Sequence, residues 1–457
     1  MNTLTKSQFT PDVLLDVLRN LPQTERYWIS YSGGMDSHVL LHAICVLRDR
    51  HLISVRDCDD AVHAVHINHG LSTNAEKWEQ HCEITCKQLA VSFHHVSVNA
   101  NPPVGESPEA AARKARYQAI SAFIQKGDCL LTAHHQDDQA ETLLIQLLRG
   151  AGPHGLASMP LYTSFKDGLH ARPLLTFTRN QLLAYAKQNG LRWINDETNL
   201  DTKVTRNFIR HDVLPVLRSR WPNVTKTLAR SAKHCGDAAF LIDKQGLIDL
   251  QGLSTETKSV IDINKLMLLD DRRRRNVIRV WLRQLDFPLP SAIQLERLLN
   301  DALSGNNDSA ASLCWQGVEI RRYRNFLFAQ HSKSEFDSAI IMDWDMDDES
   351  ELVLPDGRLT SSLVYGQGIS YETCQSGRIS VRYRQGGEKC KLPAQRFSKR
   401  LKQLFQEKGI PPWQRDRTPL LFVGEKLAAV IGLCICEPFV AGADEPGLVV
   451  TWVQNSR

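Results

Sequence analysis

Tyr31-Ser32-Gly33-Gly34-Met35-Asp36-Ser37-His38 decides how the first half of this chain is folded. A short aromatic and β-branched run, residues 27–30, precedes it, and apolar residues recur at helical spacing up to Leu47 after it. The pattern predicts a strand, a tight loop and a helix. Paired glycines let backbone N–H groups face a ligand, and a helix N-terminus adds partial positive charge. Such a loop suits a polyphosphate.

The loop differs from the common phosphate-binding P-loop at one decisive position. No lysine follows its glycines, and the acidic Asp36 stands there instead. A carboxylate that faces a triphosphate needs a divalent cation between them, so we predict that Asp36 binds Mg²⁺, with hydroxyl donors from Ser32 and Ser37. The alternative is a plain strand-to-helix turn in which Asp36 caps the helix.

Ser32-Gly33-Gly34-Met35-Asp36-Ser37 resembles the Ser-Gly-Gly-x-Asp-Ser signature of the PP-loop ATP pyrophosphatases. The resemblance implies that these six residues bind ATP, which is split between its α- and β-phosphates to adenylate a carbonyl oxygen. The class includes amide-forming synthetases and tRNA-modifying enzymes. This motif alone does not choose among them.

Composition sets outer limits on the protein. A length of 457 residues favours about three domains. No apolar run approaches the ~20 residues of a membrane span and the start is polar, so we expect a soluble cytoplasmic protein without a membrane partner. The eleven cysteines lie scattered in apolar runs without any Cys-x-x-Cys. This argues against a zinc site, an iron–sulfur site or a dithiol pair, and predicts that most cysteines are core residues.

Strands and helices alternate in the first half. Strands are predicted at residues 61–67, 91–96, 129–133 and 169–175, which indicates an α/β, doubly wound parallel sheet with its ligand at the carboxyl ends of the strands. Helices alone are predicted for residues 224–250, 270–285 and 291–303. A β-rich end follows, with one basic helix at residues 398–408. Domain boundaries are therefore expected near residues 220 and 335.

Charge is distributed unevenly. The net charge of +4 is modest, but residues 378–417 hold twelve Lys or Arg against three acidic residues. Tyr383, Phe397, Phe405 and Trp413 lie among them, and such a mixture fits a surface that binds RNA. The alternative is a solvated helix face.

Further polar residues stand where strands of the first half end. His66 and Asn68 end the second strand and are predicted to line a nucleotide pocket, unless each is simply a surface polar residue or a hydrogen-bonded core histidine. Arg113, on the helix after the third strand, is placed to bind a phosphate, unless it belongs to an exposed Glu/Arg ladder. Arg206 and Arg210 begin a later helix and suit phosphate or the RNA backbone, unless that helix is simply a capped surface helix.

The stretch His134-His135-Gln136-Asp137-Asp138-Gln139-Ala140-Glu141-Thr142 is the most informative one after the loop. It puts two histidines at a strand end and the carboxylates Asp137, Asp138 and Glu141 on the first turns of a helix. Three carboxylates beside a phosphate site would repel ATP unless a metal ion or a cation lies between them, so we predict an amine substrate. The alternative is that the helix dipole alone favours them there.

Taken in order, these stretches resemble the bacterial tRNA-isoleucine lysidine synthases. The likeness covers the loop, His66-x-Asn68-His69-Gly70-Leu71, residues 109–117, residues 134–142, Arg149-Gly150-Ala151-Gly152-Pro153, Arg206-Asn207-x-Ile209-Arg210, Arg382-Tyr383-Arg384-x-Gly386-Gly387-Glu388 and Leu401-Lys402-x-Leu404-Phe405. Ala133 departs from the glycine that many members carry before the first histidine.

The resemblance implies three domains: an ATP-binding catalytic domain at residues 1–220, a helical substrate-binding domain at 221–335 and a tRNA-binding domain at 336–457. The cytosine C2 oxygen of a CAU-anticodon tRNA(Ile) would attack the α-phosphate of ATP, and the ε-amine of L-lysine would then expel AMP. Arg113 would contact the α-phosphate, and His134 would lie near the base. Asp137, Asp138 and Glu141 would bind the lysine ammonium or take its proton. The residues implied to bind RNA are Arg206, Arg210, Arg382, Arg384, Lys399, Arg400 and Lys402.

Three other functions remain open at this point. Thiolation of tRNA on the same loop normally requires catalytic or cluster-binding cysteines, and the missing Cys-x-x-Cys weakens it. An amide-forming synthetase would leave the basic end without a purpose. An RNA-binding module with a purely structural loop is the third, and Asp36→Ala would leave such a protein unaffected.

Overall fold

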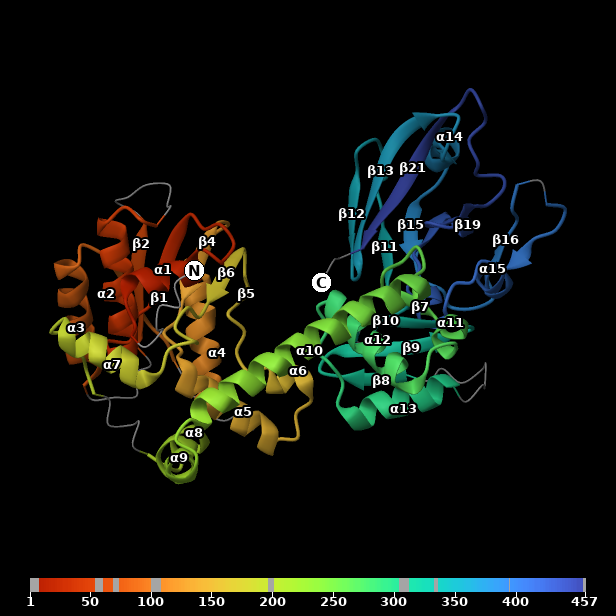
Figure 1. The fold of residues 1–457 in the computed structure, drawn as a ribbon. Coiled ribbons are helices and arrows are strands. Elements are labelled where there is room, and N and C mark those ends of the chain that lie inside the picture. Colours follow the sequence, from red (N-terminus) through yellow and green to blue (C-terminus); the bar gives the residue numbers. More distant parts are fainter. Residues whose placement is uncertain are drawn as a thin grey trace. The chain divides into compact units, whose positions relative to one another are not determined.

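The computed structural model describes residues 8–53, 61–68, 74–99, 108–195, 201–303, 312–332, 336–393 and 395–454. The chain divides into two compact units, Met1–Lys244 and Gln245–Arg457 (Figure 1). The division into three domains near residues 220 and 335 stays a prediction. Within the described residues, no helix is long and apolar enough to cross a membrane.

The first unit is built on a six-stranded sheet of order β3-β2-β1-β4-β6-β5. All neighbouring pairs are parallel except β5 and β6, which are antiparallel at the edge. The predicted doubly wound parallel sheet is thereby confirmed, although the edge strand β5 was not predicted and β6 ends earlier than expected. The strands are β1 (Arg26–Ser30), β2 (Val62–Asn68), β3 (Ser92–Ser97), β4 (Asp128–Leu131), β5 (Tyr162–Phe165) and β6 (Gly168–Ala171).

Helices precede and connect these strands, and a continuous helical segment follows them. It consists of α8 (Thr205–Phe208), the π-helix η3 (Ile209–Val213) and α9 (Leu214–Arg220), and after it α10 (Val224–Leu253) runs past the boundary between the units. The other helices are α1 (Pro11–Leu18), α2 (Met35–Asp49), α3 (Ala75–Gln88), α4 (Pro108–Ser121), α5 (Gln136–Leu148), α6 (Pro153–Leu156) and α7 (Arg179–Gln188).

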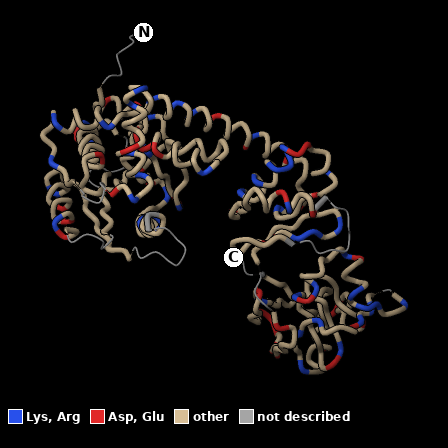
Figure 2. The backbone as a smooth tube through the Cα atoms, turned by 90° about the horizontal axis from the view of Figure 1, so that it is seen from below, with Lys and Arg blue, Asp and Glu red and all other residues tan. Residues whose placement is uncertain are grey.

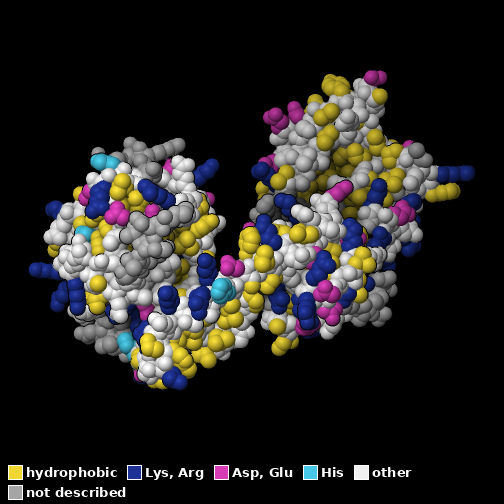
Figure 3. Space-filling model, in the orientation of Figure 1, with side chains coloured by type: hydrophobic (Ala, Val, Ile, Leu, Met, Phe, Trp, Pro, Cys, Tyr) yellow, Lys and Arg dark blue, Asp and Glu magenta, His cyan; other side chains and the backbone are white. Residues whose placement is uncertain are grey.

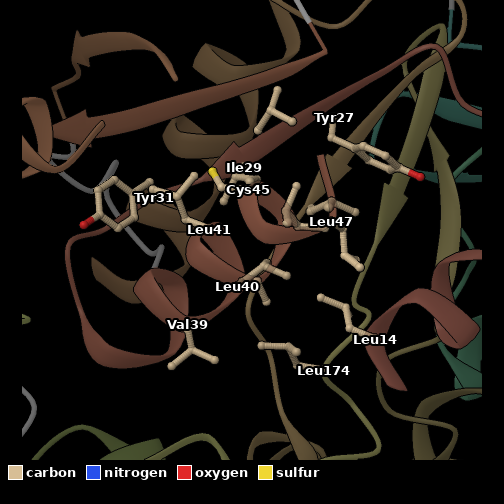
Figure 4. Close-up of a cluster of buried hydrophobic side chains, with 14 of the residues drawn as sticks. Leu14, Tyr27, Ile29, Tyr31, Val39, Leu40, Leu41, Cys45, Leu47 and Leu174 are labelled. Carbon is tan, nitrogen blue, oxygen red and sulfur yellow. The ribbon is translucent and has the colours of Figure 1, made fainter. Parts of the chain in front are cut away.

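Helix α2 is held by the main core of the first unit (Figure 4). Val39, Leu40 and Leu41 are fully buried, and Ile29 of β1 is fully buried in the same cluster. Burial of each such side chain is worth about 1.5–3 kcal/mol relative to its exposure. The loop between β1 and α2 is therefore anchored at both ends on closely packed elements.

The second unit contains one helix-covered sheet and several small antiparallel sheets. The first sheet has the order β7-β10-β9-β8, so the prediction of helices alone after residue 224 was wrong at β7, which pairs with β10. Its elements are β7 (Val260–Asp262), α11 (Ile263–Met267), α12 (Asp271–Gln284), α13 (Ala292–Leu303), β8 (Ser312–Trp315), β9 (Val318–Tyr323) and β10 (Phe326–His331).

The β-rich end has sheets of order β11-β15-β18-β19-β20 and β12-β13-β21-β14, and a two-stranded ribbon of β16 and β17. The predicted basic helix at 398–408 is shorter than expected, because Lys399–Arg400 form β17. The elements are β11 (Ile341–Asp343), β12 (Glu351–Leu354), β13 (Gly357–Tyr365), β14 (Ile369–Ser370), α14 (Tyr371–Gln375), β15 (Ile379–Arg382), β16 (Lys389–Cys390), β17 (Lys399–Arg400), α15 (Leu401–Glu407), α16 (Pro412–Arg415), β18 (Leu420–Val423), β19 (Lys426–Val430), β20 (Cys434–Ile435) and β21 (Pro446–Gln454).

The cysteines largely follow the prediction. Five of the free cysteines are buried, as expected of small core side chains: Cys45, Cys82, Cys86, Cys129 and Cys374. Cys390 and Cys436 instead form a disulfide, which sequence spacing did not reveal.

Candidate active site

The glycine loop joins β1 to α2 and is closed by its own serines. Ser37 Oγ donates to the carbonyl of Gly34 at 3.0 Å, and the hydroxyls of Ser32 and Ser37 lie 3.1 Å apart. Gly33 has a φ of 78°, and a Cβ there would lie 2.8 Å from Ile194 and 2.9 Å from Cys82. The positive φ favours glycine at this position, and a Cβ would in addition force the side chains of Ile194 and Cys82 to shift. Met35 is buried, and its apolar side chain packs in the core.

Asp36 stands on the first turn of α2. Its Oδ1 atom is buried without a hydrogen-bond partner among the described residues, whereas its Oδ2 atom lies 3.6 Å from Nε2 of His135. The part of the chain that the structure describes holds no cluster of three His, Cys, Asp or Glu that could bind a metal. The single carboxylate of Asp36, with its unpartnered Oδ1, fits Mg²⁺, since that ion is usually held by one or two carboxylates together with substrate phosphates and water.

His135 is the hub of this acidic group, although it was not among the predicted site residues. It is almost fully buried, and Asp36, Asp137 and Asp138 all lie within 3.4–3.7 Å of its ring nitrogens. Burial opposes its charge, but Asp138, Asp36 and Asp137 outweigh burial and raise the pKa of His135 to about 9. His135 is therefore an imidazolium at neutral pH.

The predicted carboxylates of α5 come together, but each faces an arginine. Glu141 accepts from Arg206 Nε at 3.0 Å and from Arg210 Nε at 2.7 Å. Asp138 accepts from Arg210 Nη2 at 2.9 Å and from the backbone N–H of His135. Burial would raise the pKa of Asp138, but His135 and Arg206 lower it to about 2.

Asp137 completes the set with different partners. It pairs with Arg218 of α9 and accepts from the backbone N–H of Arg179 at the start of α7. Counting Asp36, four carboxylates thus face three guanidinium groups and one imidazolium. These carboxylates therefore do not need an amine substrate to offset their charge, because the chain supplies positive charge itself. The amine substrate stays a prediction.

Arg206 and Arg210 reach this cluster from the segment that contains the π-helix. The wider turn of η3 changes the direction of successive side chains, and π-turns are common at functional sites. Both guanidinium groups are less than one-third exposed and are directed at Glu141. Their assignment to RNA stays a prediction.

His66 and Asn68 end β2 beside the loop. His66 is buried, and its Nδ1 atom lies 2.9 Å from the backbone carbonyl of Tyr31, so it fixes the first residue of the loop. Burial lowers the pKa of His66, so the ring is neutral and donates this hydrogen bond. The stretch His69-Gly70-Leu71 lies outside the described residues. A nucleotide-binding role for His66 and Asn68 stays a prediction.

Arg113 and His134 form a second group beyond the carboxylates. Arg113 is exposed on α4, with its guanidinium 4.9 Å from the ring centre of Tyr117. His134 Nδ1 lies 2.9 Å from Thr132 Oγ1, which also contacts His170. Burial lowers the pKa of His134 to about 3, since the nearby Asp138 only partly offsets that effect and Arg206 adds to it. His134 is therefore neutral.

The basic end of the chain separates into paired and unpaired cations. Arg382 pairs with Glu425, Arg384 with Asp416, and Lys399 with Glu407. Arg400 and Lys402 are exposed and have no ion-pair partner among the residues described. Of the four aromatic residues noted in this region, Tyr383 and Phe405 are buried, Trp413 packs on Tyr323 and Phe328, and Phe397 is 75% exposed.

Sequence reasoning missed four residues of the site: His135, His170, Arg172 and Arg218. His135 carried a signal, because it stands in the quoted stretch next to His134, but two adjacent histidines give no hint of which one is charged. His170 lies in β6 and Arg172 directly follows that strand, but both fell inside the strand predicted at residues 169–175, so the sequence did not mark them as site residues. Arg218 had no motif to mark it.

Known families match three parts of the chain. A PP-loop domain model matches residues 8–217, a TilS substrate binding domain model residues 261–328, and a TilS substrate C-terminal domain model residues 379–452. A tRNA(Ile)-lysidine synthase of Coxiella burnetii is 42% identical over 96% of both chains. One of Methylococcus capsulatus is 38% identical over 93% of this chain and 96% of its own. A solved TilS C-terminal domain covers 26% of this chain and 100% of its own at 20% identity, with a TM-score of 0.22.

Proposed function

Because this chain belongs to the tRNA(Ile)-lysidine synthase family, we propose that it uses ATP to join L-lysine to C2 of the wobble cytidine in a tRNA(Ile) with the anticodon CAU. The similarity to relatives of that name runs from end to end, and this observation carries the proposal. The three-domain division of the sequence is kept as part of it, with ATP bound at residues 1–220 and tRNA at 336–457.

The loop between β1 and α2 binds the diphosphate part of ATP in this proposal. Ser32 and Ser37 offer hydroxyls, and the backbone N–H groups at Gly33 and Gly34 stand at the N-terminus of α2. Asp36 would hold Mg²⁺ through its unpartnered Oδ1, and the ion would neutralise phosphate charge when bound. The exposed guanidinium of Arg113 binds the α-phosphate.

The reaction has two balanced steps. The cytosine C2 oxygen attacks the α-phosphorus, the bond from that phosphorus to the bridging oxygen breaks, and diphosphate leaves. The ε-amine of lysine then attacks C2, the C2–O bond breaks, AMP leaves with that oxygen, and the amine nitrogen loses a proton. Adenylation is needed because a carbonyl oxygen is a poor leaving group.

In this scheme the lysine ammonium binds to the cluster of Asp137, Asp138 and Glu141 by taking the place of an arginine. All three carboxylates already pair with arginines, so the lysine ammonium has to replace a guanidinium contact on Asp138 or Glu141. A carboxylate that is released from its arginine can then take the proton of the attacking amine. Arg206 and Arg210 would at that point be free to contact phosphate.

RNA binds to the β16–β17 ribbon in the second unit. The ribbon and the start of α15, residues 389–402, hold six Lys or Arg and no acidic residue. Lys389 and Arg400 are directly opposite each other in the register, and like charges in such a pair are destabilising unless an anion lies against them. Figure 2 shows the basic positions on this protruding ribbon.

Phe397 supplies a stacking surface at the same place. Its ring is 75% exposed, with the guanidinium of Arg396 5.7 Å from the ring centre. Figure 3 shows basic and hydrophobic side chains together where the ribbon projects. An exposed aromatic ring among cations suits an unpaired base and its phosphates. Arg400 and Lys402 are unpaired among the described residues and are kept as RNA contacts. Lys399, Arg382 and Arg384 pair with carboxylates in the free protein and would have to leave them to contact RNA.

The proposed function is tested with purified protein, ATP, labelled lysine and a CAU-anticodon tRNA transcript. We expect label in the RNA together with AMP and diphosphate. A transcript that differs only in the wobble base serves as the control and should stay unlabelled. ATP cleavage without label in the RNA would assign the chain another acceptor.

A further inference from the structure

Four side chains behind the carboxylate cluster form one hydrogen-bonded chain. They are Arg172, His170, Thr132 and His134, and we call them the histidine relay. Arg172 Nη2 lies 3.1 Å from His170 Nδ1, and Thr132 Oγ1 lies 2.9 Å from both His170 Nε2 and His134 Nδ1. Arg172, His170 and Thr132 are buried. Only His134 carries a role in the proposed reaction.

The donors in this relay have one consistent arrangement. A guanidinium group can only donate, so Nδ1 of His170 accepts from Arg172 and carries no proton. Burial, together with the charges of Arg172 and other neighbours, lowers the pKa of His170 to about 2, so the ring is neutral and its proton is on Nε2. His170 therefore donates to Thr132 Oγ1.

Thr132 passes this constraint on to His134. Its hydroxyl accepts from His170 and has one hydrogen left to donate. Of the described residues, only His134 offers that hydroxyl an acceptor, through Nδ1. If the hydroxyl accepted from Nδ1 of His134 as well, its own hydrogen would have no acceptor among the described residues. The arrangement that satisfies every group therefore leaves Nδ1 of His134 unprotonated and puts its single proton on Nε2.

We propose that Arg172, His170 and Thr132 are positioning residues that hold His134 as the neutral tautomer with its proton on Nε2. His134 then donates a hydrogen bond to an acceptor atom of the bound nucleotides and does not act as the base. This role rests on the proposed function. It assigns proton removal to the carboxylates of α5, and a donor that stays neutral adds no charge beside Arg113 and Arg206.

A purely structural network would predict a different outcome from mutation. Buried histidines need partners wherever they occur, so the same contacts could merely satisfy a polar core. A positioning role in addition requires that the tautomer of His134 changes when the relay is cut, and that kcat changes with it while the lysine KM does not.

The test uses the full chain with ¹⁵N-labelled histidine, and His134→Gln identifies the signal of His134. Wild type should show a protonated Nε2 and a bare Nδ1 at neutral pH. Thr132→Val removes the hydroxyl at nearly constant volume, and we expect a mixture of tautomers and a kcat that is lower by about tenfold. Thr132→Ser keeps the hydroxyl and should restore both properties. Arg172→Met tests the far end of the relay in the same way.

Three results would overturn the proposal. They are a proton on Nδ1 of His134 in wild type, an unchanged tautomer and kcat in Thr132→Val, or an equal loss in Thr132→Ser. The proposed function fails separately, if wild type transfers no lysine to RNA. The nitrogen spectra would still decide the tautomer in that case.

Discussion

The arginines of the first unit and the cations of the ribbon were both predicted to bind RNA, yet their surroundings differ. Arg206 and Arg210 are less than one-third exposed and pair with Glu141, which is almost fully buried. Arg400 and Lys402 are exposed and, in the described part of the chain, unpaired. A basic residue in a motif thus does not reveal its partner. Pairing separates the arginines of the carboxylate cluster from the cations that we propose to contact RNA.

The largest effect is expected from breaking the buried group. Arg210→Met removes the nearest guanidinium of Asp138 and leaves Glu141 with Arg206 alone. Loss of one partner of a fully buried ion pair costs about 3–5 kcal/mol, which is the upper limit for this partly exposed arginine. We expect a clearly lower stability in urea unfolding and at least about a hundredfold loss of lysine transfer. Adding Glu141→Gln to the same chain should recover part of the stability but not the activity. Wild-type behaviour of Arg210→Met would remove the distinction between the two regions.

Substitutions in the ribbon should lower tRNA affinity and leave kcat unchanged. Phe397→Ala removes the exposed ring, and base stacking on an aromatic side chain is worth about 1–3 kcal/mol. We expect tRNA affinity to fall about tenfold in filter binding, with an unchanged kcat at saturating tRNA. Tyr365→Ala is the matched control, because the Tyr365 side chain is 71% exposed in the same unit but lies outside the ribbon. Equal losses in both variants would refute a specific stacking role.

A smaller change is expected from the opposed cations of the ribbon. Lys389→Gln combined with Arg400→Gln should weaken tRNA binding a few-fold and reduce the slope of log affinity against log salt by about 2, one for each lost phosphate contact. Arg382→Gln is the comparison, since Glu425 already pairs with that guanidinium. If Arg382→Gln lowered the slope as much as the double variant, pairing would not predict RNA contact.

The smallest effect is the pH dependence of the free energy of unfolding, to which the buried His170 contributes. The pKa of His170 is lowered to about 2, whereas the unfolded chain binds a proton near pH 6.5. Below pH 6.5 the unfolded state therefore gains protons that the folded state does not, and stability is lost as pH falls. At pH 6 this amounts to about 0.8 kcal/mol. His170→Gln should reduce the difference in unfolding free energy between pH 7.5 and pH 6 by that amount, and an unchanged difference would contradict the lowered pKa.

Local patterns predicted the parts of the fold that depend on neighbours in sequence. The loop from Tyr31 to Ser37, the strands around it and the parallel order of the sheet follow from spacing, glycine pairs and alternating elements. The partners of Glu141 could not be predicted in this way, because Arg210 lies 69 residues away. The charge state of His135 likewise depends on Asp36, which another strand end brings close. Motifs thus identified most residues of the site, but their protonation states and ion-pair partners could be read only from the tertiary structure.

The central claim is that the loop at Asp36 transfers the adenylate of ATP to an RNA base before lysine arrives. Wild-type protein should be incubated with tRNA and ATP labelled at the α-phosphorus, first without lysine and then with it. We predict that label enters the RNA in the first stage and leaves as AMP in the second, and that Asp36→Asn blocks the first stage. Lysine incorporation in which labelled phosphorus never becomes attached to RNA would contradict this account.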